Sequence, residues 1–356
     1  MPFKFLYMPT FRARQQELLV LKSFAFGDAI IPMIEIIKEK DRVDNTREIS
    51  TIWQDIIKSI NASRVLIDLP TYYKRTSSMP KEIVSFEISH LSNLHNRISF
   101  YDYFVPYSAK VIPVISSLLT KTGEANTISR QVKALRSKFP NLAFRLFVNG
   151  FDEDIIEVKK IISAEDILIY DYGTPSTSNV LIKMQVQQIH DLSCYKVAMS
   201  SAINKEIQNK GLKNDAVVIE ADNILLETFK NPPLSVNAFG DYAGIKKDEL
   251  SSGGTISPGF VIYNPVDNLY YGFNSVLKEL SEFKNTIVPT VLKSDIVSQM
   301  NKTSPDFLND QNSGWSTIQK IAFGEDNGKS QAKFKRISIE HYLHCVKQLI
   351  LSGRIN

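Results

Sequence analysis

Four carboxylate side chains stand at or near the ends of short apolar segments that are spread along the chain. They are Glu35, Asp68, Asp171 and Asp241. Oxygen ligands of this kind can bind divalent cations. Carboxyl groups in different surroundings can also divide into a protonated acid and an ionised base for acid–base catalysis. The four residues are therefore candidate catalytic residues. The cofactor is unknown from the sequence, with a divalent cation as the candidate.

Each carboxylate also has a structural interpretation. Aspartate often follows a strand because it caps the next helix. A carboxylate could equally pair with a cation, for which Arg12, Arg14 and Arg145 are the candidates. Geometry separates the two interpretations. A metal site needs the carboxylates close together, whereas structural carboxylates would each face a separate arginine or helix N-terminus.

Other side chains near these ends are candidates for ligand binding. The candidates are Tyr7, Arg12, Arg14, Arg145, Tyr242, Gly253 and Gly254. Loops after the last strand of an eight-stranded α/β barrel often bind phosphate, which favours the two glycines. A flexible glycine-rich loop needs no ligand, however. Tyr7 could be a core aromatic residue with a polar tip.

The apolar segments are typical of parallel strands that are buried on both faces. They are short and rich in β-branched residues, and they alternate with segments of helical spacing. The predicted strands are Phe5–Met8, Ile30–Ile36, Arg64–Leu69, Val111–Ser116, Phe144–Asn149, Ile167–Asp171, Lys196–Ser200 and Leu234–Phe239. Pro9 is expected to end the first strand. Asp215–Lys230 is expected to be mainly the seventh helix, with a strand over Val217–Ile219 as the alternative for its start. Eight strand–helix units predict an α/β fold of the (β/α)8 TIM-like barrel type, whose functional groups come from the C-terminal strand ends.

The sequence after strand eight predicts an elaboration of the barrel. Phe260–Tyr263 and Leu269–Phe273 flank a turn sequence and predict a β-hairpin. Ile337–Leu351 has the spacing of an amphipathic helix. We predict one barrel domain over residues 1–356, with residues 245–335 as an insertion on the C-terminal face before the final barrel helix. A separate second domain is the alternative.

Composition sets further bounds. The formal net charge of +4 over 356 residues is too small to imply a nucleic-acid partner. Two cysteines, Cys194 and Cys345, provide neither a disulfide framework nor a thiolate-rich metal site, and they fit a reduced cytoplasm. No segment approaches transmembrane length, so we expect no membrane association.

Enzyme classes with strong sequence signatures are disfavoured. The chain has no Gly-x-Ser-x-Gly elbow and no dinucleotide fingerprint. Gly324–Ser330 is one residue short of a phosphate-binding loop. His341 and His344 lack a third ligand nearby, so we expect them to have surface or packing roles.

Several short motifs resemble a known family. Tyr7-x-Pro9 with Glu17 downstream, followed by Ile31–Glu35, resembles the start of the phage and prokaryotic beta-protein family. Phe239–Gly244 is similar to the Gly-Asp-Tyr motif of that family. The aromatic hairpin around Tyr270-Tyr271 and the segment Ile339–Leu343 also fit its layout, but its usual first lysine is replaced here by Arg12 and Arg14. The resemblance implies a context of phages, mobile elements and phage–host conflict, and it implies no reaction and no catalytic residues.

Two hypotheses about function follow. The first is a recognition or regulatory barrel of a phage–host conflict system, serving antiviral defence or a mobile element, that binds a protein or nucleic-acid partner. The alternative is a metal-dependent phosphodiester hydrolase that uses the four carboxylates at the barrel mouth. The first is favoured because a fold alone does not imply a function, and because the sequence lacks strong enzyme motifs. The sequence determines neither the ligand nor the oligomeric state, nor whether the chain serves host or phage.

Overall fold

The computed structural model describes residues 3–39, 46–72, 75–174, 177–219, 221–247 and 257–355. Its contacts divide the chain into two compact units. The first contains Met1–Ser200 and Thr228–Asp241, and the second contains Ser201–Glu227 and most of the chain after Asp241. A single barrel domain with an insertion at residues 245–335 stays a prediction.

The first unit is a parallel barrel. Among the described residues, eight parallel strands close in the order β1-β2-β3-β4-β5-β6-β7-β9. The strands are β1 (Tyr7–Arg12), β2 (Met33–Glu35), β3 (Val65–Asp68), β4 (Val111–Ile115), β5 (Ala143–Phe147), β6 (Ile167–Gly173), β7 (Tyr195–Ser200) and β9 (Ala238–Asp241). Almost all of their residues are buried, as expected for parallel strands that are covered on both faces. The predicted (β/α)8 TIM-like fold is confirmed.

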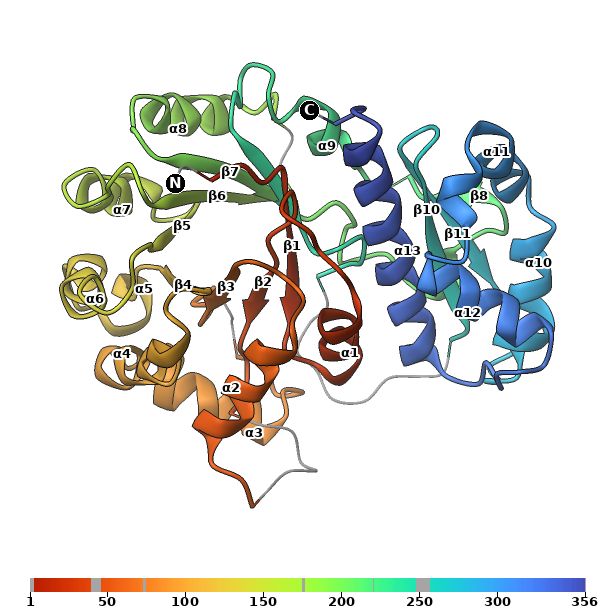
Figure 1. Cartoon of the computed structure of the whole chain (residues 1–356), viewed down its shortest axis with the longest axis horizontal. Helices are drawn as coiled ribbons and strands as arrows, with labels where there is room; N and C mark the ends of the chain where they lie inside the picture. Colours follow the sequence, from red (N-terminus) through yellow and green to blue (C-terminus); the bar gives the residue numbers. More distant parts are fainter. Residues whose placement is uncertain are drawn as a thin grey trace. The chain divides into compact units, whose positions relative to one another are not determined.

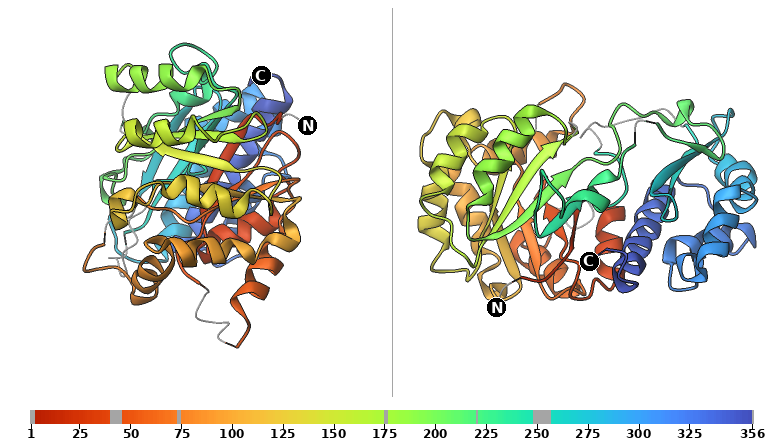
Figure 2. Two further views of the ribbon diagram at one scale, coloured as in Figure 1. Left: turned by 90° about the vertical axis from the view of Figure 1, so that its left-hand side faces the viewer. Right: turned by 90° about the horizontal axis from the view of Figure 1, so that it is seen from above.

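Helices form the outer layer of the barrel (Figure 1). They are α1 (Gln15–Ser23), α2 (Ile49–Ser59), α3 (Lys81–Phe86), α4 (Leu94–Asp102), α5 (Leu119–Thr122), α6 (Thr127–Leu135), α7 (Phe151–Val158) and α8 (Val180–His190). Figure 2 shows the yellow and green helices running alongside the strands. Helix α2 illustrates the sequence logic, because its apolar stripe buries Trp53, Ile56 and Ile57.

Three element predictions were wrong. Strand β1 passes through Pro9, which lies in register with Asp241, because proline suits extended backbone and removes only one donor. The last barrel strand begins at Ala238, not Leu234, since Ser235 has a φ of 43° that a strand residue does not adopt. The predicted seventh helix contains α9 (Ile224–Thr228) only. Its β-branched start forms β8 (Ala216–Val217) instead, paired with a distant strand.

The second unit contains a small sheet and several helices. Strands β10 (Gly259–Asn264) and β11 (Leu269–Asn274) form the predicted antiparallel hairpin, and β8 pairs with β11. The helices are α10 (Val288–Leu292), α11 (Asp295–Thr303), α12 (Ser313–Ala322) and α13 (Gln331–Leu351). Helix α13 packs on β10 and α12, and Figure 2 shows it beside the hairpin.

None of the helices in the described ranges combines the length and the apolar character needed to cross a bilayer.

The glycines of the Gly-Asp-Tyr-Ala-Gly motif permit close packing. A Cβ atom on Gly240 would lie 2.9 Å from the carbonyl oxygen of Met8, inside the barrel unit. In the second unit, Gly244 has a φ of +71°, and a Cβ there would lie 2.3 Å from Cγ of Tyr342. Both contacts are too short for any side chain, so packing explains why glycine stands at these positions.

We predict that Gly244→Ala destabilises the protein by about 2 kcal/mol or more, because alanine is strained at positive φ and would displace Tyr342. Urea unfolding of the parent and the variant measures the loss. Gly211→Ala is the matched control, since nothing lies within 4 Å of its Cβ position. Equal unfolding midpoints for both variants would contradict the packing role of Gly244.

Candidate functional site

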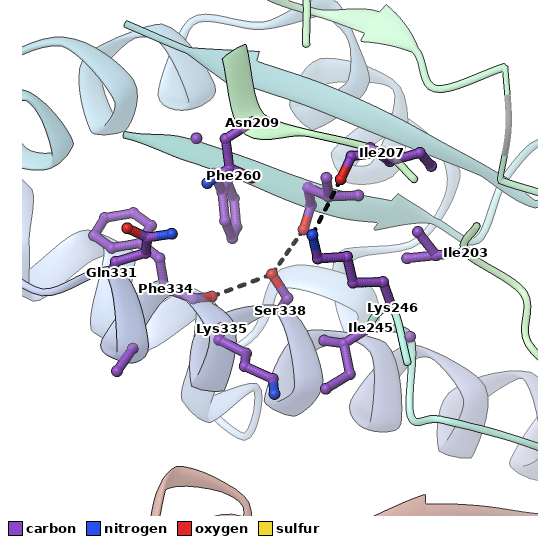
Figure 3. A pocket seen from close by; sticks show the side chains of 14 residues that line it. Ile203, Ile207, Asn209, Ile245, Lys246, Phe260, Gln331, Phe334, Lys335 and Ser338 are labelled. Atoms are coloured by element: carbon purple, nitrogen blue, oxygen red, sulfur yellow. Dashed lines mark hydrogen bonds between the residues drawn. The ribbon is translucent and has the colours of Figure 1, made fainter. Parts of the chain in front are cut away.

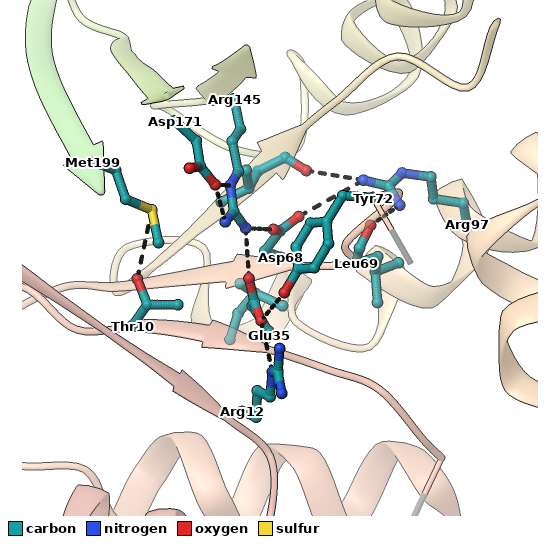
Figure 4. Close-up of polar contacts among 12 residues, drawn as sticks. Thr10, Arg12, Glu35, Asp68, Leu69, Tyr72, Arg97, Arg145, Asp171 and Met199 are labelled. Carbon is teal, nitrogen blue, oxygen red and sulfur yellow. Dashed lines mark hydrogen bonds and ion pairs between the residues drawn. The ribbon is translucent and has the colours of Figure 1, made fainter. Parts of the chain in front are cut away.

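Strand register gathers charged residues at the C-terminal end of the barrel. Arg12 lies in register with Glu35, and Glu35 lies in register with Asp68. Registered residues of parallel neighbours point to the same face of a sheet, so these three side chains share one face. Figure 4 shows them converging from neighbouring strands. All three are at least nine-tenths buried.

Arg145 of β5 bridges three of the predicted carboxylates. Its Nη1 donates to Glu35 Oε1 at 2.7 Å and to Asp68 Oδ2 at 2.5 Å. Its Nη2 and Nε donate to Asp171 Oδ2 at 2.6 and 3.2 Å. Arg145 and two of the carboxylates are fully buried, and Asp171 is 3% exposed. We call Arg145 with Glu35, Asp68 and Asp171 the arginine cluster.

Aromatic rings cover the arginine cluster. The Arg145 guanidinium lies 5.3 Å from the ring centroid of Tyr72 and 5.1 Å from that of Phe147. These two rings meet edge to face at 5.8 Å. The Tyr72 hydroxyl donates to Glu35 Oε2 at 2.7 Å. Tyr72 and Phe147 are both partly exposed, so they form an aromatic rim over buried charges.

A second buried arginine forms an ion pair with the other carboxylate oxygen of Asp68. Arg97 of α4 is 0% exposed, and its Nη2 lies 3.9 Å from Asp68 Oδ1. Arg97 also donates to the carbonyl oxygen of Leu69 and to Oε1 of Gln131. Burial raises the pKa of Asp68, and Arg145 opposes this rise. Asp68 therefore depends on its arginine partners to remain ionised.

Two buried oxygen atoms near this end lack a hydrogen-bond partner within the described ranges. They are Asp68 Oδ1 and Ser116 Oγ. Ser116 follows β4 and is 1% exposed. By strand alternation it shares the interior face with Val114, which registers with Asp68. Unsatisfied buried oxygens are costly, so these atoms mark positions where a polar ligand group could bind.

Asp241 does not join the other three carboxylates. Gly240 registers with Met199, which registers with Asp171. Asp241 is the next residue after Gly240 and therefore points to the opposite face of the barrel. It accepts a hydrogen bond of 2.6 Å from the hydroxyl of Tyr7, whose ring stacks on Phe239. Tyr7 is 0% exposed, as the core interpretation anticipated.

The remaining predicted ligand-binding residues have separate positions. Arg12 lies with its Nε 3.5 Å from Glu35 Oε2, beside the arginine cluster. Arg14 is the N-cap residue of α1 and is partly buried. Tyr242 is buried in the second unit, with Lys247 Nζ 4.8 Å from its ring centroid. Gly253 and Gly254 lie outside the described residues.

The arginine cluster differs from both geometries expected from the sequence. Glu35, Asp68 and Asp171 do converge, as a metal site requires, but they converge on a guanidinium. Across the part of the chain that is described, no group of three or more His, Cys, Asp or Glu side chains could hold a metal ion. Arg145 therefore occupies the point where the three carboxylates meet, and Arg12 and Arg97 add positive charge beside Glu35 and Asp68.

Sequence reasoning missed Tyr72, Phe147 and Arg97. Tyr72 had a usable signal, because it is an aromatic residue in the loop directly after a predicted strand. Phe147 lies within a predicted strand and looks like any core residue. Arg97 is a single cation in a helical segment, and only tertiary packing shows that it is fully buried.

The histidine pair of α13 is structural. His341 Nε2 donates to the carbonyl oxygen of Tyr263 at 2.8 Å, and Nδ1 then accepts from Asn312 Nδ2 at 2.8 Å. His344 Nε2 donates to the carbonyl oxygen of Asp306 at 2.7 Å. Burial lowers the pKa of His341 to about 4. Both hydrogen-bond sets fit neutral imidazole, as the packing expectation requires.

The sequence matches the model of one protein family. The family model described as Beta protein matches residues 7–348, nearly the whole chain. No curated protein matches the chain.

We predict that Arg145→Met destabilises the protein by about 3 to 5 kcal/mol at pH 7, because three buried carboxylates lose their shared cation. Urea unfolding measures the loss. Arg130→Met is the control, since its ion pair with Glu124 is exposed and should contribute less than about 1 kcal/mol. The destabilisation of Arg145→Met should shrink as the pH falls from 7 toward 4, because burial raises the pKa of Asp68 and its protonation then removes one of the unpaired buried charges. A loss that does not depend on pH would contradict this account.

We predict that His341 makes the parent protein less stable in acid. The unfolded histidine binds a proton below about pH 6.5, whereas the native one does so only near pH 4, so stability falls as the pH is lowered through this window. Between pH 7 and pH 5 the loss from this group should be about 2 kcal/mol. Urea unfolding of the parent and of His341→Gln, which has no titrating group there, measures the difference. Equal pH slopes would rule the effect out.

Proposed function

The chain belongs to the Beta protein family, and from this premise we propose that it is a recognition or regulatory barrel of a phage–host conflict system. In this proposal the barrel mouth binds a macromolecular partner, either a protein or a nucleic acid. The chain would act in the cytoplasm, where its two unpaired cysteines stay reduced.

The arginine cluster is the observation that carries the proposal. Catalysis by Glu35, Asp68 or Asp171 would need a carboxylate that can take up a proton or hold a metal ion. All three share Arg145 in charge-assisted hydrogen bonds, so the guanidinium stands where an ion would bind and opposes proton uptake by Asp68, whose pKa burial raises. A bridged and buried set of this kind fixes the strand ends, which suits a rigid binding surface.

The aromatic rim provides the contact surface in this proposal. Tyr72 and Phe147 are partly exposed, while the groups beneath them are buried and held by hydrogen bonds. Tyrosine and arginine are enriched among the residues that dominate binding energy at interfaces. Because the arginine cluster orders these rings in advance, little entropy would be lost when a partner packs on them.

The alternative, a metal-dependent phosphodiester hydrolase, has one supporting observation. Three of its four proposed carboxylates do lie around one point in the barrel. Arg145 occupies that point, however, and Asp241 faces away from it. This mechanism would therefore require Arg145 to leave the carboxylates before an ion could bind.

We predict that the rim variants separate binding from stability. Tyr72→Ala and Phe147→Ala should each weaken partner binding about tenfold or more, because each removes a rim aromatic. Tyr72→Phe should keep the affinity, since it removes only the hydroxyl that donates to Glu35. The measurement is capture from extracts of phage-infected bacteria by the parent and each variant, followed by titration of the captured partner. Nuclease treatment separates a nucleic acid from a protein.

Metal titration of the same proteins tests the alternative. A thermal-shift titration with Mg²⁺, Mn²⁺, Ca²⁺ and Zn²⁺ should give no shift that depends on Asp68 and Asp171. A shift in the parent that disappears in Asp68→Asn/Asp171→Asn would overturn the recognition proposal in favour of the hydrolase. Capture that is equal for the parent and both rim-to-alanine variants would also overturn it.

A further inference from the structure

The second unit contains a cavity that the barrel mouth does not involve. Its volume is about 480 Å³, within the range of roughly 300 to 1,000 Å³ that is usual for small-molecule sites. Its lining comes from β10, from the first turns of α13, and from residues of the segments 203–209 and 244–246. All of these belong to the second unit.

Most of the cavity wall is apolar. Phe260 and Phe334 meet edge to face, with ring centroids 5.5 Å apart, and each is 2% exposed. Ile203, Ile207 and Ile245 add branched aliphatic surface. The rings are fixed in the core of the unit, so the apolar wall is formed in advance. Such a wall selects a flat or branched apolar body.

The charged groups among the described lining residues are both lysines. Lys246 and Lys335 line the cavity, and no Asp or Glu is among its described lining residues. Lys246 Nζ donates to the carbonyl oxygen of Ile207 at 3.1 Å, which positions the ammonium group and leaves it with further donors (Figure 3). Ser338 is bonded to carbonyl oxygens within the wall, at 2.7 Å to Val261 and 3.1 Å to Phe334.

Helix α13 adds to this positive potential. Gln331 and Ala332, its first two residues, line the cavity. The first N–H groups of a helix have no partner inside the helix, and the helix dipole makes this end positive. The first turn of α13 carries no acidic residue that would cancel the effect. Lysines from two segments and a helix N-terminus therefore act on the same cavity.

We propose that this cavity is a binding site for a small organic anion. The apolar body of the ligand packs on Phe260 and the isoleucines, and its carboxylate or phosphate group is held by Lys246. The site is independent of the recognition function proposed for the barrel mouth.

A pair of fluorescent probes tests the proposal. Anilinonaphthalene sulfonate has an aromatic body and one negative charge, and phenylnaphthylamine has the same body without the charge. Fluorescence titration of the full chain should give one saturable site for the anionic probe. Removing the positive charge in Lys246→Gln should weaken the anionic probe about tenfold or more and leave the neutral probe within about twofold.

Matched variants locate the site. Ala332→Trp places a large side chain at the cavity lining and should weaken both probes. Lys302→Gln removes an exposed lysine of the same unit that is not among the lining residues, and it should change neither. Phe323→Ser removes a phenylalanine that is 80% exposed, and it tests for binding to the open surface.

The outcomes are decisive in both directions. Loss of the anionic probe in the lysine variant, with both probes weakened by Ala332→Trp, supports the site. Loss in Phe323→Ser, or equal weakening of both probes by the lysine variant, overturns it. Displacement of the anionic probe by adenosine monophosphate assigns a phosphate ligand, and displacement by naphthoate assigns a carboxylate. Displacement by neither compound overturns the proposal.

Discussion

The buried guanidinium of Arg145 is the interaction on which the barrel mouth depends. Three carboxylates from three strands accept its hydrogen bonds, and all four side chains are nearly or fully withdrawn from solvent. A buried charge is tolerated only when it is paired and hydrogen-bonded, so each member of the arginine cluster requires the others. This mutual requirement ties β2, β3, β5 and β6 together at one end of the barrel.

The same interaction limits what the mouth can do. Barrels of this type usually place reactive groups at the C-terminal strand ends. Here Glu35, Asp68 and Asp171 occupy such positions, but all three form ion pairs with Arg145, and Arg12 and Arg97 lie beside Glu35 and Asp68. Among the described residues around the arginine cluster, Tyr72 and Phe147 of the aromatic rim are partly exposed. The arginine cluster holds the strand ends together, and the aromatic rim provides the exposed surface. This arrangement fits recognition of a partner better than metal-assisted chemistry.

The second unit is organised by polar contacts around α13. His341 connects this helix to β10 and to Asn312 through two hydrogen bonds, and Tyr342 donates to Asn223 while it packs against Gly244. These contacts hold the part of α13 around His341 and Tyr342 in place. The first turns of the same helix line the cavity. In both units, polar contacts between buried side chains thus hold apolar side chains in place.

The sequence by itself determined the fold class and the identity of the charged residues. Buried parallel strands are continuous apolar runs, and this local pattern is visible in the sequence itself. The (β/α)8 barrel and the hairpin could therefore be predicted. Element boundaries failed where a distant partner decided them, as when Val217 paired with Tyr271 and left the predicted helix. Tertiary structure alone decided which charges meet. Register and barrel closure place Arg145 among Glu35, Asp68 and Asp171 and turn Asp241 to the opposite face, because alternation along a strand assigns a side only after its partners are fixed.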